Sequence, residues 1–231
     1  MRTGTTRADN SRPSIADLPY EMQASIFEAA MGPQVFFMEI ANEVLTFSRP
    51  ADKGLALACR LSREIYIKSK KLCEFGSNFH WVDPEQDIFY LYQDDGMRLV
   101  RPSIVNTRLP GGERFDASVL QNVAVDLQYL GEHPRRDAAI RIWTIFPSLK
   151  TLHVFVPDGP PRTPALDVTP ETLVLCELRR IQVVAPPGQD KELWSAVKYQ
   201  LIKTCSRILD SENGWNGRTR PEVVGHLTRS R

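Results

Sequence analysis

Three consecutive segments in the middle of the chain constrain the fold more than any other feature. Residues 122–127 and 149–156 are short and rich in aliphatic and β-branched side chains, which is typical of buried strands. Residues 134–146 lie between them and carry Trp143 and Phe146 at helical spacing. A strand, a helix and a strand in this order predict two parallel strands joined by a right-handed crossover. We therefore expect an α+β fold with a mixed sheet.

Amphipathic helices are expected on both sides of this region. Apolar side chains recur every four residues through 18–30, and the Gly32-Pro33 pair then ends the predicted helix. Residues 54–72 return to helical spacing and predict a second amphipathic helix. Residues 191–209 predict a C-terminal helix with one buried stripe. The stripe consists of Trp194, Val197, Leu201, Cys205 and Ile208.

Short runs of aromatic and β-branched residues predict further strands. Residues 35–47 are expected to form a two-stranded hairpin. Residues 79–82 and 88–92 flank a turn and are expected to pair as a second hairpin. One more strand is expected at 177–184.

The two ends of the chain are polar. Residues 1–14 and 211–231 predict disorder, because they hold few apolar side chains that could pack. We expect a single domain over 15–210, since this length suffices for one core. The sequence shows neither a secretory leader nor a run of about eighteen apolar residues. This favours an intracellular protein, cytoplasmic or nuclear, without a membrane partner.

Charge and cysteine usage exclude few functions. Lysine and arginine total 29 against 28 aspartate and glutamate, so the formal net charge is +1. A chain with this balance has no global field for nucleic acids or anionic membranes, which disfavours both as partners. The four cysteines form no C-x-x-C pair and predict reduced, buried thiols. They are Cys59, Cys73, Cys176 and Cys205.

No motif for nucleotide, phosphate or serine-hydrolase chemistry occurs in the sequence. The histidines lack the spacing of metal ligands, which favours structural or surface roles. They are His80, His133, His153 and His226. Acidic residues gather within 83–95, where Asp-Pro and Asp-Gly pairs are ordinary turn chemistry. We therefore predict no enzyme activity, no catalytic, metal or cofactor-binding residue, no cofactor and no small-molecule substrate.

Two features keep a nucleic-acid or chromatin role open as an alternative. Basic residues occur at 68–71 and in the C-terminal tail, although such clusters are usually solvated faces. Those of the tail are Arg218, Arg220, Arg229 and Arg231. Aromatic side chains of the second hairpin could stack on bases, but they would equally suit a core. They are Phe79, Trp81, Tyr90 and Tyr92.

Four short motifs follow one another along the chain. They are Leu18-Pro19-x-Glu21, Cys59-Arg60-x-Ser62-Arg63, Trp81 followed by Pro84-Glu85-x-Asp87-x-x-Tyr90, and Phe146-Pro147-x-Leu149-Lys150. Over about residues 16–156, this order resembles the fungal domain family named for its two Glu-x-Arg (EXR) motifs. Gln23 and Leu61 replace one residue in each motif, so the chain resembles a divergent member. Residues 146–154 also resemble one strand of a leucine-rich repeat, although one unit cannot form a solenoid.

The resemblance implies an F-box-like N-terminal helix, a mixed α/β body, structural roles for the motif residues and no established activity. On this basis we expect a non-catalytic protein–protein interaction module with an unknown protein partner, with an F-box-like adaptor as one form. An enzyme of unrecognised type is the least favoured alternative. From the residues themselves we expect Glu21 to form an ion pair with Arg60 or Arg63 across two helices.

Overall fold

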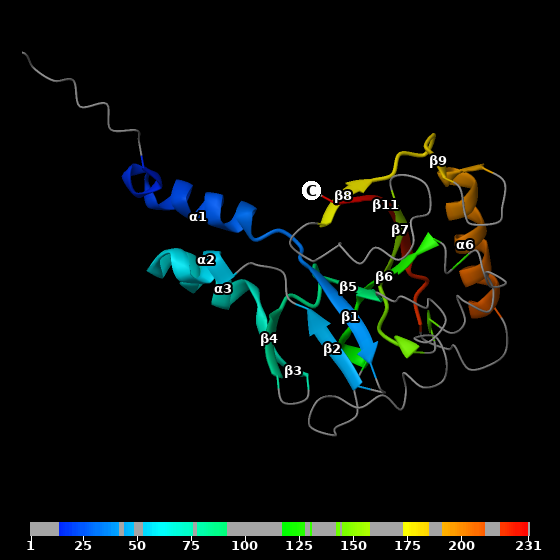
Figure 1. Cartoon of the computed structure of the whole chain (residues 1–231), viewed down its shortest axis with the longest axis horizontal. Coiled ribbons are helices and arrows are strands. Elements are labelled where there is room, and N and C mark those ends of the chain that lie inside the picture. Colours follow the sequence, from blue (N-terminus) through cyan, green and yellow to red (C-terminus); the bar gives the residue numbers. More distant parts are fainter. Residues whose placement is uncertain are drawn as a thin grey trace, which may run out of the picture. The chain divides into compact units, whose positions relative to one another are not determined.

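The computed structural model describes most of the chain (Figure 1). The described residues are 14–41, 44–48, 53–75, 78–91, 117–127, 130, 142–143, 145–157, 173–184, 191–210 and 218–230. Contacts divide the chain into two compact units. Unit 1 comprises Met1–Gly32 and Asp52–Lys68, and unit 2 comprises Pro33–Ala51 and Ser69–Arg231. Each unit is described by itself, and the single domain over 15–210 stays a prediction.

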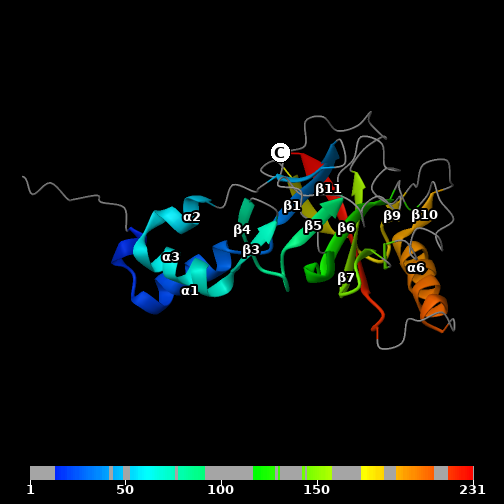
Figure 2. The ribbon, with the colours of Figure 1, turned by 90° about the horizontal axis from the view of Figure 1, so that it is seen from below.

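The described part of unit 1 is helical (Figure 2). It contains a short 3-10 helix, η1 (Ile15–Asp17), followed by α1 (Tyr20–Ala30), α2 (Lys53–Ala58) and α3 (Arg60–Ser69). The helix expected over 18–30 is confirmed as α1, which begins two residues later because Pro19 is its cap. The prediction of a single helix over 54–72 is wrong. The helix is interrupted at Cys59, and residues from Lys71 onward form the strand β3 (Lys71–Phe75).

Cys59 explains the break, because it caps α3. Its Sγ accepts the backbone N–H of Ser62 at 3.3 Å, and the Ser62 Oγ accepts the backbone N–H of Cys59 at 3.0 Å. This reciprocal arrangement is that of a capping box, with sulfur in place of the usual hydroxyl and serine in place of the usual glutamate. Apolar periodicity continues through both helices, so it could not reveal the break.

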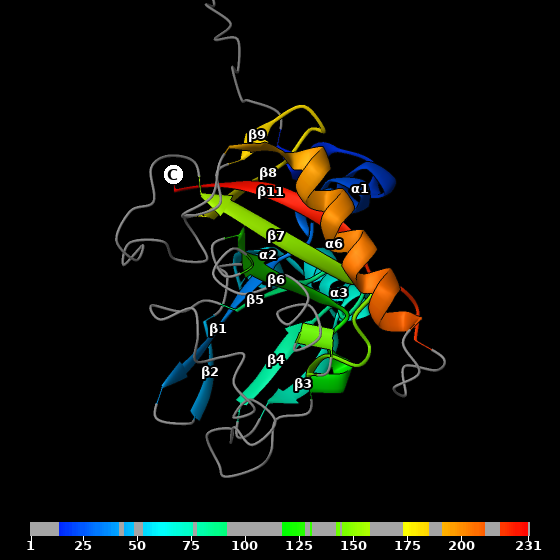
Figure 3. The ribbon, with the colours of Figure 1, turned by 90° about the vertical axis from the view of Figure 1, so that its right-hand side faces the viewer.

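Unit 2 contains a seven-stranded sheet (Figure 3). Its strands are β1 (Val35–Ala41), β2 (Val44–Ser48), β5 (Ile88–Leu91), β6 (Asn122–Asp126), β7 (Thr151–Pro157), β8 (Leu173–Glu177) and β11 (Glu222–Ser230). The spatial order is β2-β1-β5-β6-β7-β11-β8. The strands from β1 to β11 in this order run parallel, and β2 and β8 are antiparallel edges. The predicted mixed sheet, the β1–β2 hairpin and the parallel β6–β7 pair are confirmed.

The expected pairing of 79–82 with 88–92 is wrong. β4 (Asn78–Val82) pairs with β3 (Lys71–Phe75) in a separate two-stranded sheet, whereas β5 pairs with β1 and β6. Two strands that follow each other across a short turn resemble a hairpin in sequence. Here β1, far away in the chain, occupies the place beside β5.

The C-terminal region also differs from expectation. Residues 211–231 were expected to be disordered, but β11 lies inside the sheet between β7 and β8. Its polar flanks hide an alternating strand whose Val223 is buried. The strand expected at 177–184 is misplaced, because β8 ends at Glu177 and a turn then leads to β9 (Val183–Val184). β9 pairs with β10 (Glu192–Leu193).

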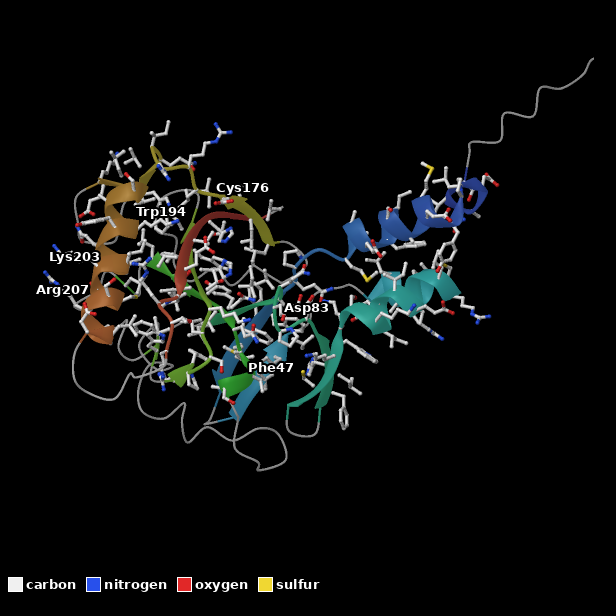
Figure 4. The ribbon with its side chains drawn as sticks, turned by 180° about the vertical axis from the view of Figure 1, so that it is seen from behind. Phe47, Asp83, Cys176, Trp194, Lys203 and Arg207 are labelled. Carbon is white, nitrogen blue, oxygen red and sulfur yellow. The ribbon has the colours of Figure 1, made fainter. Side chains whose placement is uncertain are left out.

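The helix α6 (Trp194–Leu209) covers one face of the sheet, which we call the apolar face. Its buried residues are the five predicted for the stripe, so that prediction is confirmed. Trp194 lies on the sheet side of the helix (Figure 4) and packs over Gly225 of β11. A Cβ atom on Gly225 would lie 2.5 Å from Cε2 of the indole, so this close approach requires glycine.

Several other predictions are settled only in part. Ile142, Trp143 and Ile145 of the helix expected at 134–146 are helical, and most of the remainder lies outside the described residues, as do Tyr92 and His133. All four cysteines are free, but only Cys205 is buried, and Cys59 and Cys176 are exposed. Within the described segments, no helix has the length and apolar character needed to cross a membrane.

Candidate functional site

The motif residues lie in both units. Leu18, Pro19 and Glu21 lie at the start of α1, and the Cys59–Arg63 motif begins α3. The predicted ion pair is wrong, since among the described residues Glu21 forms no ion pair with either arginine. Arg60 Nε instead lies 2.9 Å from Glu64 Oε1, one turn along its own helix. Arg63 Nε donates to the carbonyl of Ala56.

Gln23 has a local role at the position where the resemblance predicts arginine. Its Nε2 donates to the carbonyl of Leu18 at 2.7 Å, which ties α1 to the segment that precedes it. The bond stays inside one helix and the segment before it. A neutral side chain at this position therefore supports the helix start.

In unit 2, the third motif ends in a buried ion pair. Lys70 Nζ lies 3.0 Å from Asp87 Oδ2 and 3.2 Å from Oδ1, and both side chains are almost completely buried. Asp87 also accepts the backbone N–H groups of Gln34 at 2.9 Å and Asp83 at 2.7 Å. Burial raises the pKa of Asp87, while Lys70 and the two N–H groups lower it. The pair ties together the starts of β1, β3 and β5, which is a structural role.

This ion pair also changes the interpretation of the lysine cluster. Lys70 is buried against Asp87, so only Lys68 and Lys71 of the cluster are exposed. Asn122 Nδ2 reinforces the same turn by donating to the carbonyl of Glu85 at 2.9 Å. The predicted turn is confirmed at residues 83–87, and residues 92–95 of the acidic region lie outside the described residues.

The described aromatic residues of the expected hairpin belong to two different sheets. Phe79 is exposed and Trp81 half-buried on β4, and both share a face with exposed Leu72 of β3. His80 points to the other side and is buried near the rings of Phe36 and Phe47. Tyr90 belongs to the large sheet and is buried.

An apolar stripe is exposed on α1 in unit 1. The helix buries Phe27, with Met31 following it, and places Glu21 and Glu28 on another side. Met22 and Ile26 lie one turn apart on a third side of the helix, away from both, and are 52% and 38% exposed. We call Met22 and Ile26 the α1 stripe.

The face of the sheet opposite α6 carries a group of ionisable side chains, which we call the ionisable row. Asp126, Phe155, His226 and Glu177 are partners across β6, β7, β11 and β8, so their side chains point to the same face. Tyr90 and His153 lie on this face one step away. The row consists of Tyr90, Asp126, His153, His226 and Glu177.

Short hydrogen bonds join the row in pairs. The Tyr90 hydroxyl donates to Asp126 Oδ1 at 2.7 Å. His153 Nδ1 and His226 Nε2 lie 2.8 Å apart, so one ring nitrogen donates and the other accepts. Phe155 separates the two pairs, with its ring centroid 4.8 Å from that of Tyr90 and 5.8 Å from that of His226.

Burial governs the protonation of these groups. It raises the pKa of Asp126 to about 6, against a smaller lowering by the Tyr90 hydroxyl. Burial, with a smaller contribution from the neighbouring His226, lowers the pKa of His153 to about 4. The pKa of His226 is lowered by burial and raised in part by Glu177. Near neutral pH both histidines are therefore uncharged, and one ring donates a hydrogen bond to the other.

The sequence did not single out Asp126 as a functional candidate. The available signal was a lone acidic residue at the end of an apolar strand. The pairing of His153 with His226 depends on β11, which was not expected, and so no spacing rule could find it. Among the residues that the structure covers, no three His, Cys, Asp or Glu side chains are grouped as metal ligands would be.

Comparisons with known proteins give no assignment. No protein-family model, no curated protein and no solved structure matches the chain. Membership of the family with two Glu-x-Arg motifs therefore stays a prediction that depends on the motif residues alone.

Proposed function

We propose that the chain is a non-catalytic protein–protein interaction module and that unit 1 is its docking element. The observation that carries this proposal is the α1 stripe. Met22 and Ile26 expose apolar surface at the i, i+4 spacing that helices use to anchor in apolar grooves or against other helices.

The distribution of exposed apolar side chains supports this choice. Among the described residues, six of thirteen exposed large hydrophobic side chains belong to unit 1, the smaller of the two units. They are Ile15, Tyr20, Met22, Ile26, Leu57 and Ile67. A small unit that leaves this much apolar surface in water gains stability when a partner covers it.

An F-box-like adaptor is the specific form of this proposal. The family resemblance suggests it, and the helical character of η1, α1, α2 and α3 is compatible with it. The β1–β2 hairpin, which interrupts the helices in sequence, belongs to unit 2. The partner of this form would be the linker subunit of a cullin ubiquitin ligase, and the fungal source and the cytoplasmic or nuclear location remain part of the proposal.

Calorimetric titration of the full chain with a purified linker subunit tests the adaptor form. We expect Met22→Ser with Ile26→Ser to weaken binding by at least about tenfold, because central apolar anchors carry most interface energy. Ile181→Ser is the matched control, since it removes an aliphatic side chain of unit 2 that is even more exposed than Met22 and Ile26. If the wild-type chain does not bind, the adaptor form is wrong.

The wider proposal has its own test. Affinity purification with the wild-type chain, the double α1 variant and the control is compared by mass spectrometry. A partner retained by the wild type and by Ile181→Ser, but lost by the double variant, supports docking through α1. If no retained protein depends on the α1 stripe, the proposal is wrong.

A nucleic-acid role is the second candidate, favoured by the exposed Phe79 on the β3–β4 hairpin. Exposed Lys68 and Lys71 lie nearby in sequence, although Lys70 and Tyr90 are buried. Binding to mixed RNA and DNA should then weaken steeply as salt is raised and should fall in Phe79→Ser. Binding that ignores salt, or no binding, eliminates this candidate.

A further inference from the structure

Three exposed aliphatic side chains lie at and beside the β9–β10 pair. Val183 and Leu193 are opposite partners in this two-stranded sheet, so their side chains share one side, and Ile181 lies in the turn that precedes β9. Val183 is 61% exposed, Leu193 is 47% exposed and Ile181 is 79% exposed. The neighbouring Val184 and Trp194 are buried on the other side. We call Ile181, Val183 and Leu193 the β9–β10 tip.

The backbone beneath this tip is held by hydrogen bonds. Trp194 donates its backbone N–H to the carbonyl of Gln182 at 2.8 Å, and Ser195 donates to the carbonyl of Arg180 at 3.2 Å. Gln182 closes the turn by donating to the carbonyl of Arg179 at 3.0 Å. These bonds join the tip to the start of α6, so the aliphatic side chains are presented by a defined backbone.

Basic residues flank the tip in sequence and continue along α6. Arg179, Arg180 and Lys191 are exposed beside it. The α6 sequence contains Lys198, Lys203 and Arg207 and no acidic residue. Lys203 and Arg207 lie on the outer side of the helix and point away from the sheet (Figure 4). Residues 179–207 hold six lysine or arginine and two acidic residues, in a chain with a net charge of only +1.

We propose that this basic face binds the surface of an anionic phospholipid membrane. The β9–β10 tip enters the boundary between headgroups and acyl chains, and the lysine and arginine side chains contact lipid phosphates. Apolar side chains for insertion, combined with cations for the anionic surface, are the two components of peripheral membrane binding. No membrane-spanning helix is needed for this mode of binding.

The composition of the tip favours lipid over nucleic acid. Nucleic-acid surfaces combine cations with aromatic rings on which bases stack. Here the three tip residues are aliphatic, and Tyr199 is the aromatic residue exposed on α6. Its ring already has Lys203 Nζ at 6.0 Å from the centroid. Aliphatic side chains cannot stack on bases, whereas they partition readily into acyl chains.

This proposal differs from the sequence expectation of no membrane partner for a physical reason. That expectation used the net charge of the whole chain, which averages this face with a remainder that is acidic overall. A surface field depends on the local arrangement of charge within about a Debye length of about 8 Å. Arg179, Arg180 and Lys191 flank β9 and β10 in sequence and the basic residues of α6 follow, so this segment is positive although the total charge is near zero.

Sedimentation of the full chain with phospholipid vesicles tests the proposal. We expect binding to vesicles of phosphatidylcholine mixed with phosphatidylserine, weak binding to phosphatidylcholine alone, and release by salt. Two variants should each reduce the partition coefficient by about tenfold or more, because each lipid-facing cation or methyl-rich side chain contributes severalfold. They are Ile181→Ser with Val183→Ser, and Arg179→Glu with Arg180→Glu.

Matched controls use other exposed positions in unit 2. Phe79→Ser removes an exposed apolar side chain and Lys150→Glu reverses an exposed charge, and neither should change vesicle binding. Thermal melts confirm that each variant folds. If the double serine variant does not fold, Ile181→Ser alone replaces it, since this side chain is the most exposed of the three.

Any of the following outcomes would overturn the proposal. They are no binding to vesicles of either composition, equal binding to both compositions, equal loss in the control variants, and binding to single-stranded oligonucleotides without binding to vesicles. Loss in the charge variant but not in the serine variant would also contradict it, because insertion of the tip would then play no part. The α1 stripe is not involved in any of these measurements, so this test and the test of the adaptor form can fail independently.

Discussion

The two faces of the large sheet are built from the same strands but differ in chemistry. On the apolar face, Val123 and Val125 of β6 and Leu152 and Val154 of β7 are buried beneath aliphatic and aromatic side chains. On the opposite face, the same two strands carry Ala124, Asp126, His153 and Phe155. Successive residues of a strand point to opposite sides, so one stretch of chain supplies both surfaces.

The difference teaches where this protein gains stability and where its pH sensitivity arises. Close packing dominates the apolar face, because Trp194 leaves no room for a side chain at Gly225. Protonation equilibria of partly buried groups dominate the other face, because Asp126 and the histidine pair are half-buried and partly shielded from water. The apolar face should therefore respond to changes in volume, and the ionisable row should respond to pH.

Trp194→Ala should have the largest effect. Removing the indole leaves a cavity against β11, and we expect a loss of about 3–5 kcal/mol in the free energy of unfolding. Gly225→Ala alone should cost about 1–3 kcal/mol through overlap with the ring. In the double variant the added methyl has space, so the two losses should not add. Urea denaturation measures all three values.

Val224→Ala is the control for this cycle, since Val224 is the next residue of β11 and points to the opposite face. It is half-buried, and we expect a smaller loss than for Trp194→Ala. Strict additivity between Trp194→Ala and Gly225→Ala would contradict the close approach of the two residues.

His153→Gln should change the acid side of the stability profile. Because the pKa of His153 is about 4 in the fold against 6.5 for an ordinary histidine, the unfolded chain binds a proton first as pH falls. This contribution to stability is fully present above pH 6.5 and is lost between pH 6.5 and 4. Between pH 7.5 and 4.5, the free energy of unfolding of the variant should therefore fall by about 2–3 kcal/mol less than that of the wild type. If urea denaturation shows the same acid profile for the variant and the wild type, the pKa of His153 is not lowered in the fold.

Asp126→Asn should act in the opposite direction. The pKa of Asp126 is about 6 in the fold against an ordinary value of 3.8, so the folded chain holds its proton longer as pH rises. The protonated carboxyl contributes stability below pH 3.8, and this is lost between pH 3.8 and 6. The variant has no such contribution to lose. Between pH 4 and 7.5, its free energy of unfolding should therefore rise by about 2–3 kcal/mol relative to that of the wild type.

The two contributions offset each other in the wild type, since they have opposite signs over nearly the same pH range. The free energy of unfolding of the double variant His153→Gln with Asp126→Asn should therefore depend on pH as in the wild type, whereas each single variant should change this dependence. Glu222→Gln, at an exposed position of β11, is the control and should not tilt the profile. Single variants that tilt in the same direction would contradict the assignment.

Tyr90→Phe should have the smallest effect. It keeps the ring that packs on Phe155 and removes only the hydroxyl that donates to Asp126. We expect a loss of about 1 kcal/mol in stability. Because the hydroxyl lowers the pKa of Asp126, that pKa should rise further in the variant, which carboxyl carbon NMR can measure. A fall in the pKa would show that the hydroxyl does not stabilise the carboxylate.

Local patterns predicted elements better than pairings. The stripe of α6, the β1–β2 hairpin and the strands β6 and β7 follow from periodicity and β propensity, which act over a few residues. The pairing of β5 with β1 does not, because β4 lies closer in sequence and the turn between them resembles a hairpin turn. The buried Lys70–Asp87 pair depends on that same pairing, so it was hidden within a lysine cluster and an acidic turn.

The sequence by itself determined an α+β protein, the residues that α6 buries and the alternation that divides each strand between two faces, because these depend on neighbours along the chain. Only the tertiary structure decided that β11 lies between β7 and β8, and with it the contact of His153 with His226. It also decided that Ile181, Val183 and Leu193, beside a basic segment of the chain, stay exposed whereas Val184 and Trp194 are buried. Such features depend on which distant segments become neighbours in space, and the free energy of those contacts is not encoded in any single local pattern.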